Sequence, residues 1–219
     1  MSTFPNTPRI VKGGIVLINP DTAAINRIVT LQYNPDSISR SFQIKGAGGD
    51  GGNRSEALRL TGPPAETIKL DAELDATDQL ETANPGSVVV TTGIHTQLAA
   101  LETIVYPSTA QLQLNSALSS AGTIEILPME TALTLFIWSS NRILPVRITE
   151  LSVTEEAFDV NLNPIRAKVS LGMRILTVDD FGFNHTGTSL YMRYQQNKER
   201  LSAMFAGGSL SNLGIRSVL

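Results

Sequence analysis

The sequence predicts a mainly β (α+β) protein with antiparallel strands, one helix packed on the core and a C-terminal helical extension. Several short runs rich in Ile, Val and Thr alternate apolar with polar residues, as strands with one buried face do. Two other segments place apolar residues at helical spacing. Because a β-rich chain of 219 residues often folds around one core, we expect a β domain at 1–182 and a helix with a tail at 183–219.

The first third of the chain contains four strand-like segments. Residues 15–18 and 28–33 are β-branched runs, and the Asn, Pro and Asp between them favour a turn, which predicts a hairpin. Residues 38–44 alternate apolar and polar side chains, except that Arg40 stands in an apolar position. Residues 68–74 alternate Ile, Leu and Ala with Lys, Asp and Glu, which predicts an amphipathic strand.

Residues 45–53, between the third and fourth strands, read KGAGGDGGN. Glycines have no side chains to bury, so we expect a mobile loop tip here. A phosphate-binding loop is disfavoured, because the segment lacks the Lys-Ser/Thr pair of such loops and is not flanked by a strand and a helix.

The apolar period changes from strand-like to helix-like near residue 92. Thr91 or Thr92 can cap the start of a helix, and Pro107 ends it by restricting Tyr106. We expect this helix to pack on the core and to be followed by an extended or irregular connection at 108–128. Its apolar side is formed by Ile94, Leu98, Leu101 and Val105.

Residues 133–138 are apolar on both faces toward their end, which predicts a strand covered on both sides. Trp138 fits a core or an interface better than a stacking platform. After this strand, apolar residues stand at even positions in 146–148 but at odd positions in 151–153. The change at Glu150 predicts a bulge or a sharp bend.

The alternation in residues 169–175 predicts another long strand, and the sequence NLNP before it favours a turn. In that turn Asn tolerates left-handed backbone and Pro164 fixes φ at the strand entry. We therefore expect residues 144–154 and 165–178 to pair as an antiparallel hairpin.

A second helix is expected near the C-terminus. Thr188 or Ser189 can cap its start, and the pair Gly207-Gly208 can stop it. The tail that follows carries scattered apolar residues that it cannot bury alone. Helical spacing is seen in Leu190, Tyr194, Leu201 and Phe205.

The composition is poor in charge. Charged residues make up 17% of the chain, against about 25% in an average soluble protein. Charge is depleted where protein covers protein, which favours an assembling subunit, although a small-residue β protein with a Ser/Thr-rich exterior is the alternative. A net charge of −3 indicates neither nucleic acid nor an anionic membrane as a partner.

The N-terminus lacks the features of a signal peptide, and no apolar run approaches the length of a membrane span. We therefore expect the chain to be made and folded in the cytoplasm. The chain has no cysteine, which excludes disulfides, thiolate metal sites and Cys nucleophiles.

Residues with catalytic or metal-binding chemistry are few. His95 and His185 are the only imidazoles, and their spacing to Asp179 and Asp180 matches no metal motif. The pair Glu155-Glu156 fits solvated acids, and no Gly-x-Ser-x-Gly elbow is present. We expect no catalytic residue, no cofactor and no metal. A β-sandwich enzyme or carbohydrate-binding module remains the alternative of a different class, and variants of both histidines and Asp180 would test it.

Five segments resemble, in order and spacing, the tube-like domain of the baseplate protein in contractile injection systems, the phage-tail-derived machines of bacteria. They cover about residues 13–182. The segments are LQYNPDSISRSFQ (31–43), TIKLDAELDATD (67–78), LAALETIVYP (98–107), LTLFIWSS (133–140) and ITELSVTEEAFDVNLNPIRAKVSLGMRI (148–175).

The motifs of that family fall on definite positions of this sequence. In that family, Tyr-Asn-Pro begins one strand, and an acidic residue followed closely by Thr ends the next. An aromatic residue and Pro then end a helix, a strand contains Phe-x-Trp, and a hairpin contains Phe-Asp before Pro-x-Arg-Ala. Two features depart from the family, namely the GAGGDGG insertion and an end in a helix and tail where many relatives carry a LysM module. The matching residues are Tyr33-Asn34-Pro35, Asp75-Ala76-Thr77, Tyr106-Pro107, Phe136-Ile137-Trp138, Phe158-Asp159 and Pro164-Ile165-Arg166-Ala167.

The resemblance implies a tail-tube fold, which is an antiparallel β-sandwich or partly open barrel with a packed helix, and a ring of six copies whose sheets line a lumen. It implies a structural baseplate subunit, not an enzyme, that connects the spike and hub to the inner tube and templates tube polymerisation. A repeating inner-tube subunit is the alternative within this class.

The expected partners are further copies of the chain, a tube protein, a spike or hub protein and other baseplate proteins, without nucleic acid or membrane insertion. The expected location is the bacterial cytoplasm during assembly, and then an intracellular or released phage-tail-like particle. We expect the assembly interface to include Tyr33, Asn34, Pro35, Gly48, Gly49, Asp50, Arg147, Arg166, Tyr191, Tyr194, Leu201 and Phe205.

Overall fold

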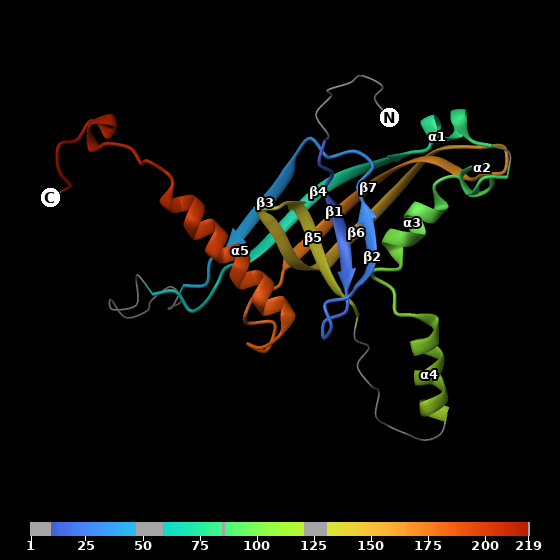
Figure 1. The fold of residues 1–219 in the computed structure, drawn as a ribbon, viewed down its shortest axis with the longest axis horizontal. Coiled ribbons are helices and arrows are strands. Elements are labelled where there is room, and N and C mark those ends of the chain that lie inside the picture. Colours follow the sequence, from blue (N-terminus) through green and yellow to red (C-terminus); the bar gives the residue numbers. More distant parts are fainter. Residues whose placement is uncertain (1–9, 47–58, 85, 121–130, 219) are drawn as a thin grey trace.

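The computed structural model describes residues 10–46, 59–84, 86–120 and 131–218. In this part of the chain one seven-stranded sheet has the order β2-β1-β5-β6-β7-β4-β3, and all neighbouring strands are antiparallel (Figure 1). The predicted mainly β, antiparallel fold is therefore confirmed. The strands are β1 Gly14–Ile18, β2 Ile25–Thr30, β3 Ile38–Gln43, β4 Ala65–Asp75, β5 Leu133–Ser139, β6 Arg142–Phe158 and β7 Pro164–Ile175.

Five α-helices lie in the described residues, where the sequence predicts two. A short 3-10 turn, Leu210–Leu213, follows the last helix. The helices are α1 Thr77–Thr82, α2 Val88–Thr92, α3 His95–Glu102, α4 Thr109–Ser120 and α5 Thr186–Ala203.

One apolar core is shared by strands from both halves of the sheet. The sheet curves so that Ile15 of β1 and Phe136 of β5 belong to the same buried cluster as Ile68 of β4 and Leu171 of β7. Leu98 of α3 completes this cluster, which confirms that the predicted helix packs on the core. Alternate residues of β4 are buried, as the sequence pattern predicts.

The strands β1 and β5 are covered on their second face as well. Val16 and Leu135 face a smaller apolar cluster, to which Leu190 of α5 and Phe181 contribute. This arrangement explains why both strands are apolar at nearly every position, and it confirms the two-sided cover predicted for residues 133–138.

The strands β6 and β7 form the predicted long hairpin, and their pairing shifts register between Ile148 and Glu150. Gly172 lies opposite the bulge, where an added Cβ would stand 2.9 Å from the Cβ of Glu150. The parity change in the sequence is therefore a β-bulge, and a glycine on the partner strand gives it room.

The turn of this hairpin differs in detail from the prediction. Leu162, not an asparagine, has left-handed backbone, with φ of +64°. The carboxylate of Asp159 accepts hydrogen bonds from the backbone N–H groups of Asn161 and Asn163, at 2.7 and 2.8 Å. Because the asparagine N–H groups bind this carboxylate, the positive φ falls on the residue between them.

The helix predicted after residue 92 is divided in two. Gly93, with φ of +56°, separates α2 from α3, and Thr92 belongs to α2 instead of capping α3. The N–H of Ile94 donates to the carbonyl oxygen of Pro164 at 2.9 Å, so the helix break contacts the turn of the β6–β7 hairpin. Thr91 also lies within α2, and Val105 lies beyond the end of α3.

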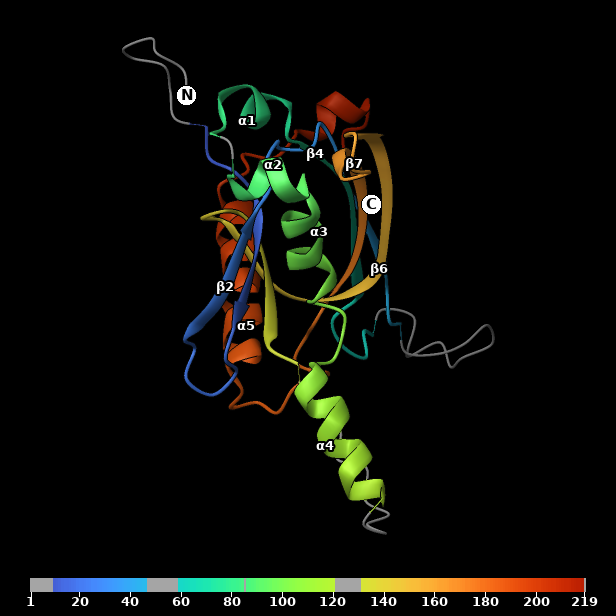
Figure 2. The same ribbon diagram turned by 90° about the vertical axis from the view of Figure 1, so that its right-hand side faces the viewer.

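The expectation of an extended connection at 108–128 is wrong for its described part, because residues 109–120 form α4. Ser108 and Gln111 cap its start reciprocally, each side chain accepting from the other's backbone N–H at 3.2 Å. No residue of α4 is buried, and Figure 2 shows the helix extending away from the sheet. Without a buried face, the sequence shows no amphipathic period.

The predicted C-terminal helix exists as α5, with a different cap. The Nδ1 atom of His185 accepts from the N–H of Gly187 at 2.9 Å, so neither Thr188 nor Ser189 is the cap. Thr188 is buried, and its hydroxyl donates to the carbonyl oxygen of Gly182. Among the described residues, no helix is long and apolar enough to cross a membrane.

Candidate assembly surfaces

One face of the strands β3, β4, β7 and β6 is polar. Across it, Lys69 pairs with Glu150 at 2.8 Å, and the hydroxyl of Ser170 donates to Asp71 at 2.5 Å. Further pairs follow along the same strands, so that charges of both signs alternate on a solvated surface. These are Lys168–Glu156 at 3.1 Å and Arg166–Asp75 at 2.8 Å.

The expected interface residue Arg166 therefore belongs to this polar face. Hydrogen bonds from the hydroxyl and N–H of Thr77, together with Arg166, hold the pKa of Asp75 below its ordinary value. The hydrogen bond to Glu150 raises the pKa of Lys69. These charged forms are therefore favoured at neutral pH.

Two arginines lie directly opposite each other on β6 and β7. Arg174 pairs with Asp180 at 2.7 Å. Arg147, which was expected in the assembly interface, is exposed and forms no ion pair within the described part of the chain. Burial acts to raise the pKa of Asp180, but hydrogen bonds from the N–H of Thr177 and from Arg174 outweigh it, so that the pKa is lowered.

The sheet ends in two edge strands, β2 and β3, each paired on one side within the described residues. The β2 edge is irregular, because the register shifts between Leu17 and Ile18, and Arg27 donates to the carbonyl oxygen of Ala100 on α3 at 3.2 Å. The β3 edge pairs regularly with β4 along its whole length and contains no proline. Within the described residues no strand pairs with the other side of β3, which is where a further strand could add.

The expected interface residues Tyr33, Asn34 and Pro35 lie in the loop before β3. Asn34 fixes this loop to the chain before β1, because its Oδ1 accepts from the N–H of Gly13 and its Nδ2 donates to the carbonyl oxygen of Val11, both at 2.9 Å. All three loop residues line a hollow of about 790 Å³ next to the polar face. Gly48, Gly49 and Asp50, and with them most of the glycine-rich segment, lie outside the described residues.

A buried acid attaches α5 to the sheet. Glu66 of β4 is 3% exposed, and its two oxygens bind Arg40 of β3 at 2.5 Å and Lys198 of α5 at 3.2 Å. Arg40 also donates to the hydroxyl of Tyr194 at 2.9 Å. The polar residue that interrupts the apolar phase of β3 is therefore one member of this α5 anchor, which consists of Arg40, Glu66, Tyr194 and Lys198.

Tyr191 and Tyr194 are buried against the sheet by their own chain. Burial raises the pKa of Tyr191, and the nearby charge of Glu66 acts in the same direction. These two expected interface residues hold α5 in place and leave little surface for a partner. Leu201 and Phe205 are exposed beyond the anchor.

The tip of the β6–β7 hairpin also presents apolar side chains. Phe158, Val160 and Leu162 are exposed on a turn that Asp159 holds rigid. Hydrogen bonds from the side chain and backbone of Asn163 lower the pKa of Asp159, so the carboxylate that organises the turn is charged at neutral pH.

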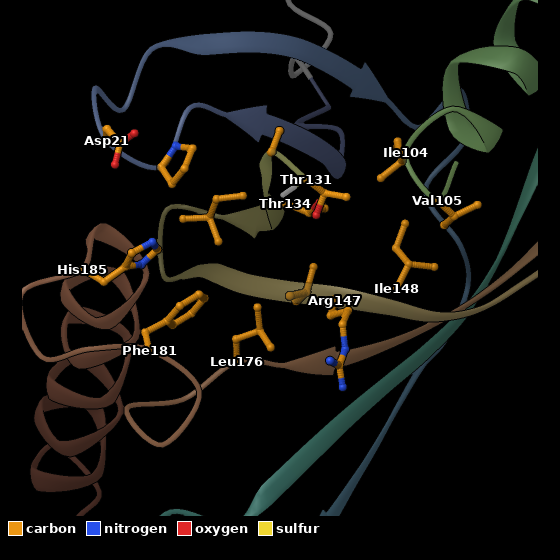
Figure 3. A pocket seen from close by; sticks show the side chains of 14 residues that line it. Asp21, Ile104, Val105, Thr131, Thr134, Arg147, Ile148, Leu176, Phe181 and His185 are labelled. Carbon is orange, nitrogen blue, oxygen red and sulfur yellow. The ribbon is translucent and has the colours of Figure 1, made fainter. Parts of the chain in front are cut away.

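An apolar groove of about 600 Å³ is shown in Figure 3. It extends from Ile104 and Val105, after α3, to Phe181 and His185, at the start of α5. Arg147 and Ile148 of β6 both line it, with side chains on opposite sides of the strand (Figure 3).

The residues considered for catalysis have separate roles in this structure. His185 caps α5 and stacks on Phe181 with ring centroids 4.4 Å apart, whereas His95 begins α3. Asp179 pairs with Lys45 at 2.7 Å, and Asp180 pairs with Arg174. Within the described ranges, no group of three or more His, Asp or Glu side chains could hold a metal ion.

Sequence reasoning missed the α5 anchor, the groove and α4. The available signals were Arg40 in an apolar phase, which indicates a partner for its charge, and the capping sequence at Ser108 and Gln111. The sequence matches no protein-family model and no curated protein.

Proposed function

We propose that this chain is a structural baseplate subunit of a contractile injection system, in which six copies form a ring. The ring joins the spike and hub to the inner tube and templates tube polymerisation. In this proposal the curved sheet is a partly open barrel of the tail-tube type, assembled in the bacterial cytoplasm, and the chain has no catalytic role.

The observation that carries the proposal is the polar face that ends at the open β3 edge. Its acids and bases are paired on the surface, as between Lys69 and Glu150, so the face suits contact with water in a lumen. Joining the edges of neighbouring copies would continue the sheet from copy to copy and satisfy the unpaired backbone groups.

The apolar surfaces at the ends of the molecule fit the same role. The hairpin tip, with Val160 and Leu162, and the segment after α5 expose apolar side chains. A subunit that lies between unlike layers needs such contacts on more than one side, and a charge-poor composition is consistent with them.

The test is to produce the chain alone and together with tube and spike subunits, and to measure mass by light scattering and shape by electron microscopy. We expect a ring of about six times the 23.5 kDa of one chain, carried in one copy per particle. A strictly monomeric chain that joins neither subunit would overturn the proposal. Long stacks of rings made from this chain alone would instead favour the repeating tube subunit.

An edge variant tests the mode of assembly. Ser41→Pro inserts a proline into β3, and Ser37→Pro places the same change in the loop before it. We expect Ser41→Pro to abolish the ring while circular dichroism shows a retained fold, and Ser37→Pro to keep the ring. Rings of normal size from a folded Ser41→Pro variant would exclude edge pairing.

A further inference from the structure

The segment after the α5 anchor, residues 201–218, is here called the C-terminal arm. Every residue in it is exposed, and Figure 1 shows it extending away from the sheet. A solvated arm with only one charged side chain, Arg216, is poorly suited to remain uncovered. Its large apolar side chains, between 41% and 79% exposed, are Leu201, Met204, Phe205, Leu210, Leu213, Ile215 and Val218.

The anchor at the base of the arm sets its direction. Lys198 binds the buried Glu66, and Tyr194 binds Arg40, within the last turns of α5. The helix then continues to Ala203, and Gly207, with φ of +72°, turns the chain toward the 3-10 turn. The anchor therefore sets the direction in which α5 leaves the body of its own chain.

The apolar groove lies at the opposite end of the same helix. Phe181 and His185 line the groove at the start of α5, and the arm begins at Leu201, in the last turn of the helix. From His185 to Leu201 the helix rises by about 24 Å at 1.5 Å per residue. An arm held by the anchor therefore projects away from the groove of its own chain.

We propose that the C-terminal arm of one copy lies in the apolar groove of a neighbouring copy. A donor at one end of a helix and an acceptor at the other end give a head-to-tail contact, and such a contact can close into a ring. This inference rests on the proposed ring and names the segment that links one copy to the next.

The area of the arm fits this occupant. Burying an aliphatic side chain of this size removes on the order of 100 Å² of apolar surface. Because the seven side chains are only partly exposed, the arm could bury at most roughly 400 Å² of apolar surface. The remainder of the ~800 Å² per partner of a stable interface would come from the edge contacts of the proposed ring.

The polar groups at the two surfaces agree with this pairing. Arg216 is the one charged residue of the arm, and the groove is lined by Asp21 and, at a separate place, by Arg147 (Figure 3). None of these three side chains forms an ion pair in the described ranges of the chain, so a contact between two copies can bring Arg216 to Asp21 only if the arm enters the groove at the Asp21 side.

Cysteine cross-linking tests the contact on the full chain, because the natural sequence contains no cysteine. A copy with Leu213→Cys in the arm is mixed with a copy carrying Val105→Cys at the groove, and oxidised dimers are measured on non-reducing gels. The matched control replaces Val105→Cys with Val88→Cys, another exposed valine, on α2. We expect the groove pair to cross-link severalfold faster than the control pair. Equal rates, or faster coupling of Leu213→Cys to itself, would overturn the proposal.

A variant that ends at Ala206 lacks residues 207–218 of the arm and separates this inference from the proposed function. We expect it to fold, because the removed residues are exposed, and to be monomeric where the full chain forms rings. Rings of normal size without residues 207–218 would disprove the arm contact and leave the baseplate proposal standing. A full chain that forms no ring, with tube and spike subunits present, would disprove both.

Discussion

The carboxylate of Glu66 and the ammonium group of Lys198, 132 positions apart in sequence, lie 3.2 Å from each other on the buried side of α5. Lys198 also stands 4.2 Å from the ring centroid of Tyr194, so its charge is held by an acid and an aromatic face together. This contact joins the C-terminal helix to the second strand from the sheet edge, and it divides α5 into a bound part and a projecting part.

Glu66→Gln should therefore weaken the attachment of α5. The change leaves Arg40 and Lys198 without their counter-charge, and hydrogen bonds to charged groups contribute about 1.5–3 kcal/mol. We expect a loss of this order in urea unfolding, with faster hydrogen exchange in α5 than in β6 and β7. Glu73→Gln, an exposed position on the same strand, is the control. Equal losses in the two variants would show that the anchor contributes nothing.

Gly93→Ala should destabilise the protein strongly. Its added Cβ would lie 2.2 Å from the carbonyl oxygen of Pro164, and its φ of +56° disfavours any side chain. Gly86→Ala separates the two causes, because Gly86 also has positive φ, of +90°, but meets nothing within 4 Å. We expect a loss of about 1 kcal/mol for Gly86→Ala and at least twice that for Gly93→Ala. A similar melting temperature for both variants would contradict this explanation.

Gly172→Ala should destabilise the protein, although replacing a strand glycine by alanine is normally stabilising. In a strand interior, alanine is normally more stable than glycine, by roughly 0.5–1 kcal/mol. Here the new Cβ meets the Cβ of Glu150 at 2.9 Å across the bulge, so we expect destabilisation of about 1–3 kcal/mol. Chemical unfolding of this variant, beside Ser152→Ala on the neighbouring strand, measures the sign. A stabilised Gly172→Ala protein would mean that the bulge does not need the glycine.

Asp180→Asn should make the stability of the folded protein depend less on pH in the acidic range. The folded-state pKa of Asp180 is lowered, so its contribution is complete above the ordinary carboxyl pKa of about 4 and is lost as pH falls through the folded value. The variant should be less stable at pH 7 and should lose less on acidification than the natural protein. Thermal unfolding at pH 7 and pH 3 measures both, with Asp179→Asn as the control, because the side chain of Asp179 is more exposed than that of Asp180. An unchanged pH slope would contradict the assignment.

Period and parity in the sequence predicted β4 and the β6–β7 hairpin well, because a strand that buries one face repeats apolar residues at every second position. The change of parity around Glu150 even located the bulge. Local patterns also predicted α3 and α5, since each has residues packed on the core. Strands and helices that pack one side on the core could therefore be predicted from the local sequence.

The rest depends on contacts between distant residues or on weak local signals. The division at Gly93 is decided by Pro164, which comes from another part of the chain, and Arg40 gave no indication that its partner was Glu66. The helix α4 has no buried residue, so only its cap could indicate it. The groove is formed by segments that sequence order does not bring together, and no single segment predicts it.

The length of β6 has a mechanical consequence. With 17 residues at about 3.3 Å each, this strand is close to 55 Å long, and it is hydrogen bonded to β7 along most of that distance. The bulge near Glu150 bends the pair of strands part of the way along. One hydrogen-bonded ladder therefore connects the neighbourhood of the hairpin tip, at Phe158, with Val146 in the body of the sheet.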